Sequence, residues 1–231
     1  FDQVKSAVLA DFQKIKAMEN PPDLIAVIPH MGTQFSHKTD NYQDTWNNIF
    51  LEAGADIILG DHAHAVQPIE FRSKPGNAAD KNVIIVNCPG NFANSYIEHD
   101  GDATAIVEVH LDPVKKEVLC AGVIPMYTQA SSDGNYRALP VYTLLNDPAL
   151  QREVGQYELR RVNEVFRIVT EVMLGTPLTL DQARERHYLF PKGYFRQAVN
   201  PIEVTTKMKN TAFYQLLEAS GSVCFVGDSI T

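Results

Sequence analysis

Two histidines, His62 and His64, stand one residue apart directly after an apolar run in the segment GDHAHA. A neutral imidazole donates a lone pair to a metal ion, and residues that alternate along an extended loop can present two imidazoles on one side. Asp61 precedes them and adds a carboxylate that could compensate the charge of a metal or hydrogen bond to a ligand. The pattern favours a metal site, and an accidental pairing within a loop is the competing interpretation.

Polar groups follow two further apolar runs. His30 ends one of these runs, and Asn87 and Asn91 flank a Pro-Gly turn after another. In α/β proteins ligands gather beyond the carboxyl ends of strands, so neighbouring strands would place His30 beside His62 and His64. Three imidazoles around one point suit a borderline divalent metal such as zinc, manganese or iron.

The elements that must position these groups alternate between helical and strand-like patterns. Apolar residues recur at helical spacing from residue 4 to 15, and a Pro-Pro pair follows them. Residues 24–30 are interpreted as a continuously apolar, doubly buried strand, and residues 55–64 as a second buried strand that runs into a loop. An amphipathic helix over residues 44–54 lies between them. This order predicts a parallel βαβ unit. Further strands are predicted within residues 66–72, 82–87, 103–111 and 117–128.

The remainder of the chain has a different texture. One long helix is predicted over residues 146–174, with Pro148 in its first turn and Gly175 after its end. Its apolar stripe predicts one packed face, and the opposite charged face is interpreted as solvated. The charged face of the helix over residues 146–174 consists of Arg160, Arg161, Glu164, Arg167 and Glu171. A further helix and a strand are predicted after residue 203.

Composition excludes several classes of protein. Of the 231 residues, 45% are hydrophobic and 21% are charged, so the chain can bury a full core. A net charge of -8 argues against a nucleic-acid partner, and the apolar runs are too short to cross a bilayer. The three cysteines, Cys88, Cys120 and Cys224, are interpreted as buried free thiols. We expect the chain to be a piece of a longer polypeptide, because it opens within a helical pattern and stops after a strand.

The remaining histidines and one acidic segment have plainer interpretations. An isolated histidine is usually a surface or hydrogen-bonded residue, and the segment 98–102 is expected to be a turn between strands rather than a metal-binding loop. The histidines interpreted in this way are His37, His99, His110 and His187.

Three ordered segments resemble a known family: residues 30–38 (HMGTQFSHK), 53–71 (AGADIILGDHAHAVQPIEF) and 83–92 (VIIVNCPGNF). They are similar to His-Trp-Gly-x-Glu, Gly-x-His-Pro-His-x-x-Gln-Pro-x-Glu and Ser-Leu-Gly-Asn-Phe of the CapA family of poly-gamma-glutamate capsule biosynthesis proteins. That family resembles the calcineurin-like metallophosphoesterases. The resemblance covers about residues 1–127 and implies an α/β (α+β) fold, namely part of a four-layer αββα sandwich with two metal ions at its strand ends.

The resemblance also assigns ligands. It implies that His30, His62 and His64 are metal ligands for manganese, iron or zinc, and that Asn91 is the asparagine of the third motif. The family's early Gly-Asp and Asn-His ligands are expected in a missing N-terminal half of the same domain, upstream of Phe1. The fragment is therefore expected to hold half of a site and to be inactive alone.

Further roles follow from the same resemblance. His64 and Asp61 are the candidate catalytic groups, and His64 could protonate a leaving group. Gln34 and Asn91 are the candidate substrate-binding residues. Gln34 stands where the family usually has glutamate, which removes a possible base or ligand charge. This departure favours the alternative that the module binds or scaffolds a polymer without catalysis.

The final residues, VCFVGDSIT, resemble the opening block of SGNH (GDSL-type) esterases. In that family Ser229 would be the nucleophile, and its base would lie in sequence after Thr231. In the competing interpretation the same strand opens a second CapA-type domain, with Asp228 as a metal ligand. In a third interpretation, Asp228 and Ser229 are capping residues of an ordinary turn.

Together these patterns predict three regions. Residues 1–130 would be the C-terminal half of a CapA-like domain, 131–203 a helical connector and 204–231 the start of an SGNH module. The expected function is capsule or surface-polymer biosynthesis through metal-dependent phosphoesterase chemistry. The alternative leaves the downstream esterase as the only enzyme. A surface polymer or a small ester or phosphoester is the expected substrate, and the resemblance implies a cell-surface or membrane-associated location.

Overall fold

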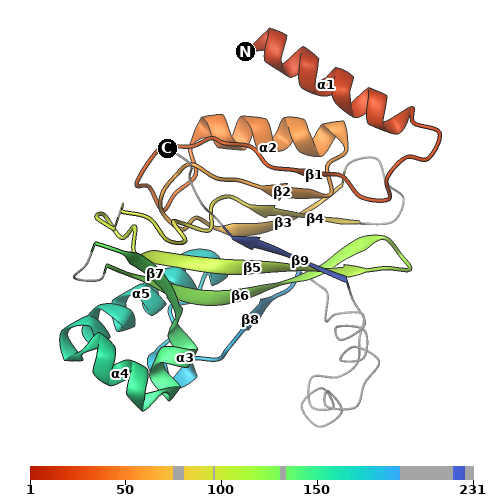
Figure 1. The fold of residues 1–231 in the computed structure, drawn as a ribbon. Helices are drawn as coiled ribbons and strands as arrows, with labels where there is room; N and C mark the ends of the chain where they lie inside the picture. Colours follow the sequence, from red (N-terminus) through yellow and green to blue (C-terminus); the bar gives the residue numbers. More distant parts are fainter. Residues whose placement is uncertain (75–80, 96, 131–133, 193–220, 227–231) are drawn as a thin grey trace.

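The computed structural model describes residues 1–74, 81–95, 97–130, 134–192 and 221–226, which form two β-sheets with helices on their outer sides (Figure 1). The layers follow one another as helix, sheet, sheet and helix. The predicted α/β class and the αββα order of layers are therefore confirmed. In this described part no helix is both long and apolar enough to cross a membrane.

The first sheet contains the predicted βαβ unit. Its strands follow the order β1-β2-β4-β3, in which β1, β2 and β4 are parallel and β3 is antiparallel. Helix α2 begins at a capping box made by Asp40 and Gln43, and it ends at Gly54, whose φ of 111° suits a residue without a Cβ. The elements are α1 (Asp2–Lys16), β1 (Ala26–Val27), α2 (Asn41–Ala53), β2 (Ile57–Leu59), β3 (Ile69–Ser73) and β4 (Asn82–Val86).

The central strands of this sheet divide their side chains between two cores. Successive side chains of a strand point to opposite faces, so continuous apolar runs in β2 and β4 fill both faces. One core lies under α1 and α2, and the other lies between the two sheets and extends to the helices that cover the second sheet. Ile58, Val83 and Ile85 pack in the first core, and Ile57, Leu59, Ile84 and Val86 pack in the second.

The prediction for residues 24–30 is wrong in one respect. The segment is a strand for only two residues, and it is not doubly buried, because Ile28 is 65% exposed. The reason is its position: among the described strands, β1 is the last in the order of its sheet, and it pairs with β2 on one side. An edge strand of apolar composition cannot be distinguished from a central strand by its sequence.

The second sheet has the order β7-β6-β5-β9, and β8 pairs with β6. The strands predicted over residues 103–111 and 117–128 are confirmed as β5 and β6. The terminal strand, predicted to open a separate module, is β9, and it pairs antiparallel with β5. The division of the chain into domains stays a prediction. The strands are β5 (Ala103–Asp112), β6 (Glu117–Ala130), β7 (Tyr136–Pro140), β8 (His187–Leu189) and β9 (Gly221–Val226).

The long helix predicted over residues 146–174 is interrupted. Gly155 has a φ of 86°, which an α-helix cannot contain, and this residue separates α4 from α5. The apolar stripe of α5 is buried, and it packs in the same core as the second sheet. The elements are α3 (Val141–Asn146), α4 (Pro148–Val154), α5 (Gln156–Leu174) and the short 3-10 helix η1 (Leu180–Gln182).

Two of the three cysteines have described side chains. Cys88 and Cys120 are buried free thiols, as predicted. Burial raises the pKa of the Cys88 thiol to about 11 and that of Cys120 to about 12, so both are protonated at neutral pH and are poor nucleophiles. The side chain of Cys224 lies outside the described part of the chain.

Candidate functional site

The loops after β1 and β2 run side by side. His30 and Asp61 form a parallel β-bridge beyond the two strands. The backbone N–H of Met31 donates to the carbonyl oxygen of Asp61 at 3.1 Å, and the N–H of Asp61 donates to that of Pro29 at 3.1 Å. The predicted neighbourhood of these two strand ends is therefore confirmed, and the backbone alone brings their side chains together.

Three imidazoles and one carboxylate lie at this edge of the sheet. The ring centroids of His30 and His62 are 4.5 Å apart, and those of His62 and His64 are 5.9 Å apart. The Nδ1 atom of His30 lies 3.5 Å from Oδ2 of Asp61. The His30 side chain is 56% exposed, so the cluster opens to solvent on the His30 side. We refer to His30, Asp61, His62 and His64 as the histidine cluster.

The backbone is strained at two residues of the histidine cluster and at the neighbouring Phe35. Phe35, His62 and His64 have φ values of 58°, 95° and 54°, in the left-handed region that favours glycine. Each such residue costs about 1–3 kcal/mol and persists only where the surrounding structure holds it. Strain of this kind gathers at functional sites, so it supports a functional interpretation of these loops.

The electrostatics of His62 favour its neutral form. Burial lowers the pKa of His62 below its usual value, and the neighbouring His30 and His64 lower it further. Asp61 acts in the opposite direction with a smaller effect. A neutral imidazole is the form that can donate a lone pair to a metal ion.

Asn91 orients His64. The buried His64 ring has its Nδ1 atom 2.8 Å from Oδ1 of Asn91, while Nδ2 of Asn91 donates to the backbone carbonyl of His64 at 3.3 Å. Because an amide oxygen only accepts, Nδ1 of His64 carries the proton, and the lone pair of the neutral ring lies on Nε2. The structure thus brings Asn91 to the histidine cluster through His64.

Phe35 covers one side of His64. Its ring stacks on the His64 ring at 5.7 Å between centroids and 25° between planes. The backbone N–H of Phe35 donates to the carbonyl oxygen of Ala63 at 2.7 Å, which joins the loops of the first and second motifs. Gln34 precedes it in an exposed turn, and its role toward substrate stays a prediction. Asp228 and Ser229 lie outside the described residues.

The donor types of the histidine cluster suit a borderline divalent metal, since imidazole nitrogens and a carboxylate oxygen are common ligands of zinc, manganese and iron. Their number and placement are incomplete. Within the described ranges, no group of three or more His, Cys, Asp or Glu side chains is arranged to hold a metal ion. The fit is therefore partial, and further ligands upstream of Phe1 stay a prediction.

Gln67 ties the motifs together, a role that the sequence analysis missed. Its side chain is fully buried, and its Nε2 atom donates to the carbonyl oxygens of Ser36 at 3.0 Å and Lys38 at 3.1 Å. Its Oε1 atom accepts from Nε2 of Gln43, in the first turn of α2, at 2.7 Å. A glutamine inside an apolar run is the signal that could have identified this buried amide.

Asn87 has a structural role rather than a place in the histidine cluster. Its Nδ2 atom donates to the carbonyl oxygen of Pro68 at 2.9 Å and to Oε1 of Glu70 at 3.1 Å. Its Oδ1 atom accepts from Nδ2 of Asn47 at 2.9 Å. These bonds connect the end of β4 to β3 on one side and to α2 on the other.

Replacing Gln67 with alanine is expected to lower the free energy of unfolding by about 2 kcal/mol, because the amide leaves polar partners unsatisfied in a buried place. Urea denaturation measures this change. Gln13→Ala, at an exposed position of α1, is the matched control and should change stability by less than about 0.5 kcal/mol. Equal effects of the two substitutions would contradict the role given to Gln67.

Comparison with known proteins identifies the segment that carries these motifs. Residues 3–96 match the family model described as bacterial capsule synthesis protein PGA_cap. The chain is 29% identical over 110 residues to the capsule biosynthesis protein CapA of Bacillus anthracis; this match covers 48% of the chain and 24% of that relative. The chain thus spans about a quarter of the length of this curated relative. Residues 3–96, which include the whole histidine cluster, are thus similar to the bacterial capsule synthesis protein family.

Proposed function

We propose that the region around the histidine cluster is part of a metal-dependent hydrolase of the phosphoesterase type that acts in capsule or surface-polymer biosynthesis. One observation carries the proposal: His30 and His62 meet at 4.5 Å between ring centroids, beside the carboxylate of Asp61. Two imidazoles and a carboxylate from separate strand ends form a donor set for a borderline metal. The capsule context comes from the names of the family and of the relative.

Each side chain has a distinct part in this proposal. His30 and His62 would hold the metal from opposite loops, and Asp61 would balance its charge. A bound divalent metal polarises a phosphoryl or acyl oxygen and supplies a hydroxide nucleophile near neutral pH. His64 keeps Nδ1–H on Asn91, so Nε2 is the atom that would carry a proton to the leaving group.

The His62→Ala substitution in the full-length protein tests this proposal. We expect hydrolysis of bis-p-nitrophenyl phosphate to fall by about 100-fold or more, since removing a ligand costs at least as much as removing its hydrogen-bonding partners. Bound transition metal, measured by elemental analysis, should fall with it. His64→Gln should lose turnover, because the part proposed for Nε2 of His64 is proton transfer to the leaving group.

His187→Gln is the matched control. His187 lies in β8, in the second sheet, and should keep both the metal and the activity of the unmodified protein. Absence of stoichiometric metal from the unmodified protein, together with unchanged hydrolysis in His62→Ala, would refute the enzyme proposal for this region.

A second candidate is a non-catalytic, polymer-binding module followed by an SGNH esterase. The glutamine at position 34, where the family usually has glutamate, favours it. The same protein preparations distinguish the two candidates when they are assayed with p-nitrophenyl acetate. Under the second candidate, acetate hydrolysis is lost in Ser229→Ala and is unaffected by His62→Ala.

A further inference from the structure

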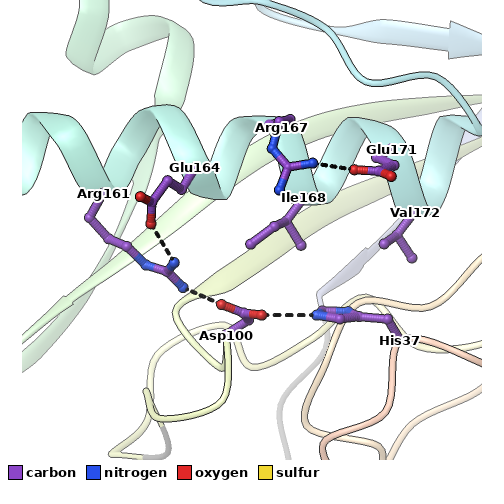
Figure 2. Close-up of a pocket in the computed structure, with 8 residues that line it drawn as sticks. All are labelled: His37, Asp100, Arg161, Glu164, Arg167, Ile168, Glu171 and Val172. Atoms are coloured by element: carbon purple, nitrogen blue, oxygen red, sulfur yellow. Dashed lines mark hydrogen bonds and ion pairs between the residues drawn. The ribbon is translucent and has the colours of Figure 1, made fainter.

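The charged face of α5, interpreted from sequence as solvated, reaches the loops of the site through one residue. Arg161 donates from Nη2 to Oδ1 of Asp100 at 2.7 Å and to Oδ1 of Asp102 at 2.6 Å. Its Nε atom donates to Oδ2 of Asp102 at 2.7 Å. Figure 2 shows Arg161 reaching from α5 to Asp100, with His37 on the far side of that carboxylate.

His37 connects Asp100 to the loops of the first and second motifs. The Nε2 atom of His37 lies 3.4 Å from Oδ2 of Asp100, and its Nδ1 atom lies 2.8 Å from the carbonyl oxygen of Val66. Because a carbonyl oxygen only accepts, Nδ1–H of His37 donates to Val66. His37 lies between Ser36 and Lys38, whose carbonyl oxygens accept from the Gln67 side chain, and Val66 directly precedes Gln67. The segment 98–102 is a turn, as predicted, and Asp100 within it contacts Arg161 on one side and His37 on the other.

This turn is strained, and it carries an aromatic contact to the histidine cluster. His99 and Asp100 have φ values of 51° and 63°. The His99 ring lies 5.4 Å from the Phe35 ring, which in turn stacks on His64. The turn that Arg161 holds therefore presents His99 to the ring that covers His64. Two left-handed residues in succession need an external restraint to stay in place.

The charge distribution makes Arg161 that restraint. Asp102 is only 6% exposed, so loss of its partner would leave a carboxylate charge nearly buried. Hydrogen bonds to Asp102 raise the pKa of Arg161 above its usual value, which keeps the guanidinium charged. Burial acts to raise the pKa of Asp100, but the hydrogen bonds from Arg161 and His37 outweigh it and hold that pKa below its usual value.

A neighbouring arginine provides the contrast. Arg167 lies further along α5 and lines the same groove of about 610 Å³ between the helix and these loops (Figure 2). It pairs with Glu171 on its own helix, and both side chains are more than half exposed. An exposed pair of this kind contributes little to stability.

We infer that Arg161 is a positioning residue for the histidine cluster, acting through the turn 98–102 and the Phe35 ring on His64. Helix α5, from the region predicted as a connector, is on this inference part of the site. The consequence for catalysis rests on the proposed function, whereas the positioning itself does not. Arg161 acts on the cluster through intermediate residues, and the aromatic route from Arg161 to His64 passes through Asp100, His99 and Phe35.

Histidine NMR spectra of the full-length protein test the inference without a substrate or a metal. The protein is labelled with ¹³C at the Cε1 atoms of histidine and stripped of metal with a chelator, and the seven histidines of this chain are assigned by substitution. Arg161→Gln is expected to shift the resonances of His37, His99 and His64. The shift of the His64 resonance should be several times that caused by Arg167→Gln.

Two further variants make the result decisive. Arg161→Lys keeps the positive charge but cannot make the forked contact with Asp102, so it should give an intermediate shift of the His64 resonance. If Arg161→Gln does not fold, the shift in Arg161→Lys tests the inference in its place. Phe35→Leu removes the aromatic link, and adding Arg161→Lys to it should no longer move the His64 resonance.

The inference is overturned if His64 keeps its resonance in the Arg161 variants while His37 and His99 shift, or if Arg167→Gln shifts it equally. These spectra are recorded without metal, so a failure of the metal-binding proposal leaves them interpretable. Conversely, an unmoved His64 resonance in a protein that loses metal in His62→Ala would refute the positioning alone.

Discussion

Alanine at position 60 is expected to separate the ends of β2 and β4 and to abolish the activity proposed for the histidine cluster. A Cβ atom at Gly60 would collide with the carbonyl oxygen of Asn87 and would lie 3.3 Å from that of Val86. The backbone N–H of Gly60 donates to the same Val86 oxygen at 2.7 Å, so the two strands cannot move apart without losing this bond. Asp61 and His62 follow directly and would be displaced.

The expected loss of stability for Gly60→Ala is about 3 kcal/mol, at the upper end for overpacking, because the obstacle is backbone rather than a flexible side chain. Urea denaturation and hydrolysis of bis-p-nitrophenyl phosphate measure the two effects. Gly175→Ala is the control, since its φ is 71° and a Cβ there meets open space. It should cost about 1–2 kcal/mol from backbone conformation alone and leave hydrolysis unchanged. Equal losses of stability in Gly60→Ala and Gly175→Ala would contradict the prediction, because they would show that the ends of β2 and β4 can move apart to accommodate the Cβ atom.

Truncating Phe166 to alanine is expected to destabilise the protein by about 3–5 kcal/mol, the range for a buried aromatic side chain. Phe166 is 1% exposed in the core that α5 shares with the second sheet, and its ring lies 5.7 Å from that of His187. Because α5 carries Arg161, the looser helix should also shift the His64 resonance in the spectra described above.

Ile168→Ala is the control for Phe166→Ala. Ile168 lies on the same helix but is only partly buried beside the groove, so its truncation should cost about 1–2 kcal/mol. If Phe166→Ala were no more costly than Ile168→Ala, α5 would not be anchored in the core. The inference about Arg161 would then lose its structural basis.

The elements that position the histidine cluster followed closely from sequence. Helix α2, with its end at Gly54, and the buried strand β2 were predicted, because apolar periodicity and terminal glycines act over a few residues. The prediction that His30 lies beside His62 rested on one further rule, that parallel strands end at a common edge. The strand that precedes His30 is nevertheless the last strand of its sheet in the described part of the chain, which could not be recognised from its apolar composition.

Helix α5 was predicted less completely. Its buried stripe followed from a period of about 3.6 residues, whereas its start did not, because a single glycine can either lie within a helix or end it. The φ of 86° at Gly155 resolves that choice. The solvated interpretation of the charged face holds for Arg167 and fails for Arg161, although both are arginines near a glutamate on one helix.

The order of amino acids was thus sufficient to identify the residue types of the site, the strands beneath it and the family motifs, since each is written in residues close together in the chain. Tertiary structure alone decided which polar groups hold these motifs in place. Gln67 meets Ser36 across 31 residues, and Arg161 meets Asp102 across 59. Such partners depend on how the layers stack, and a hydrogen bond requires its two atoms to meet within about 3 Å, a precision that no local pattern encodes.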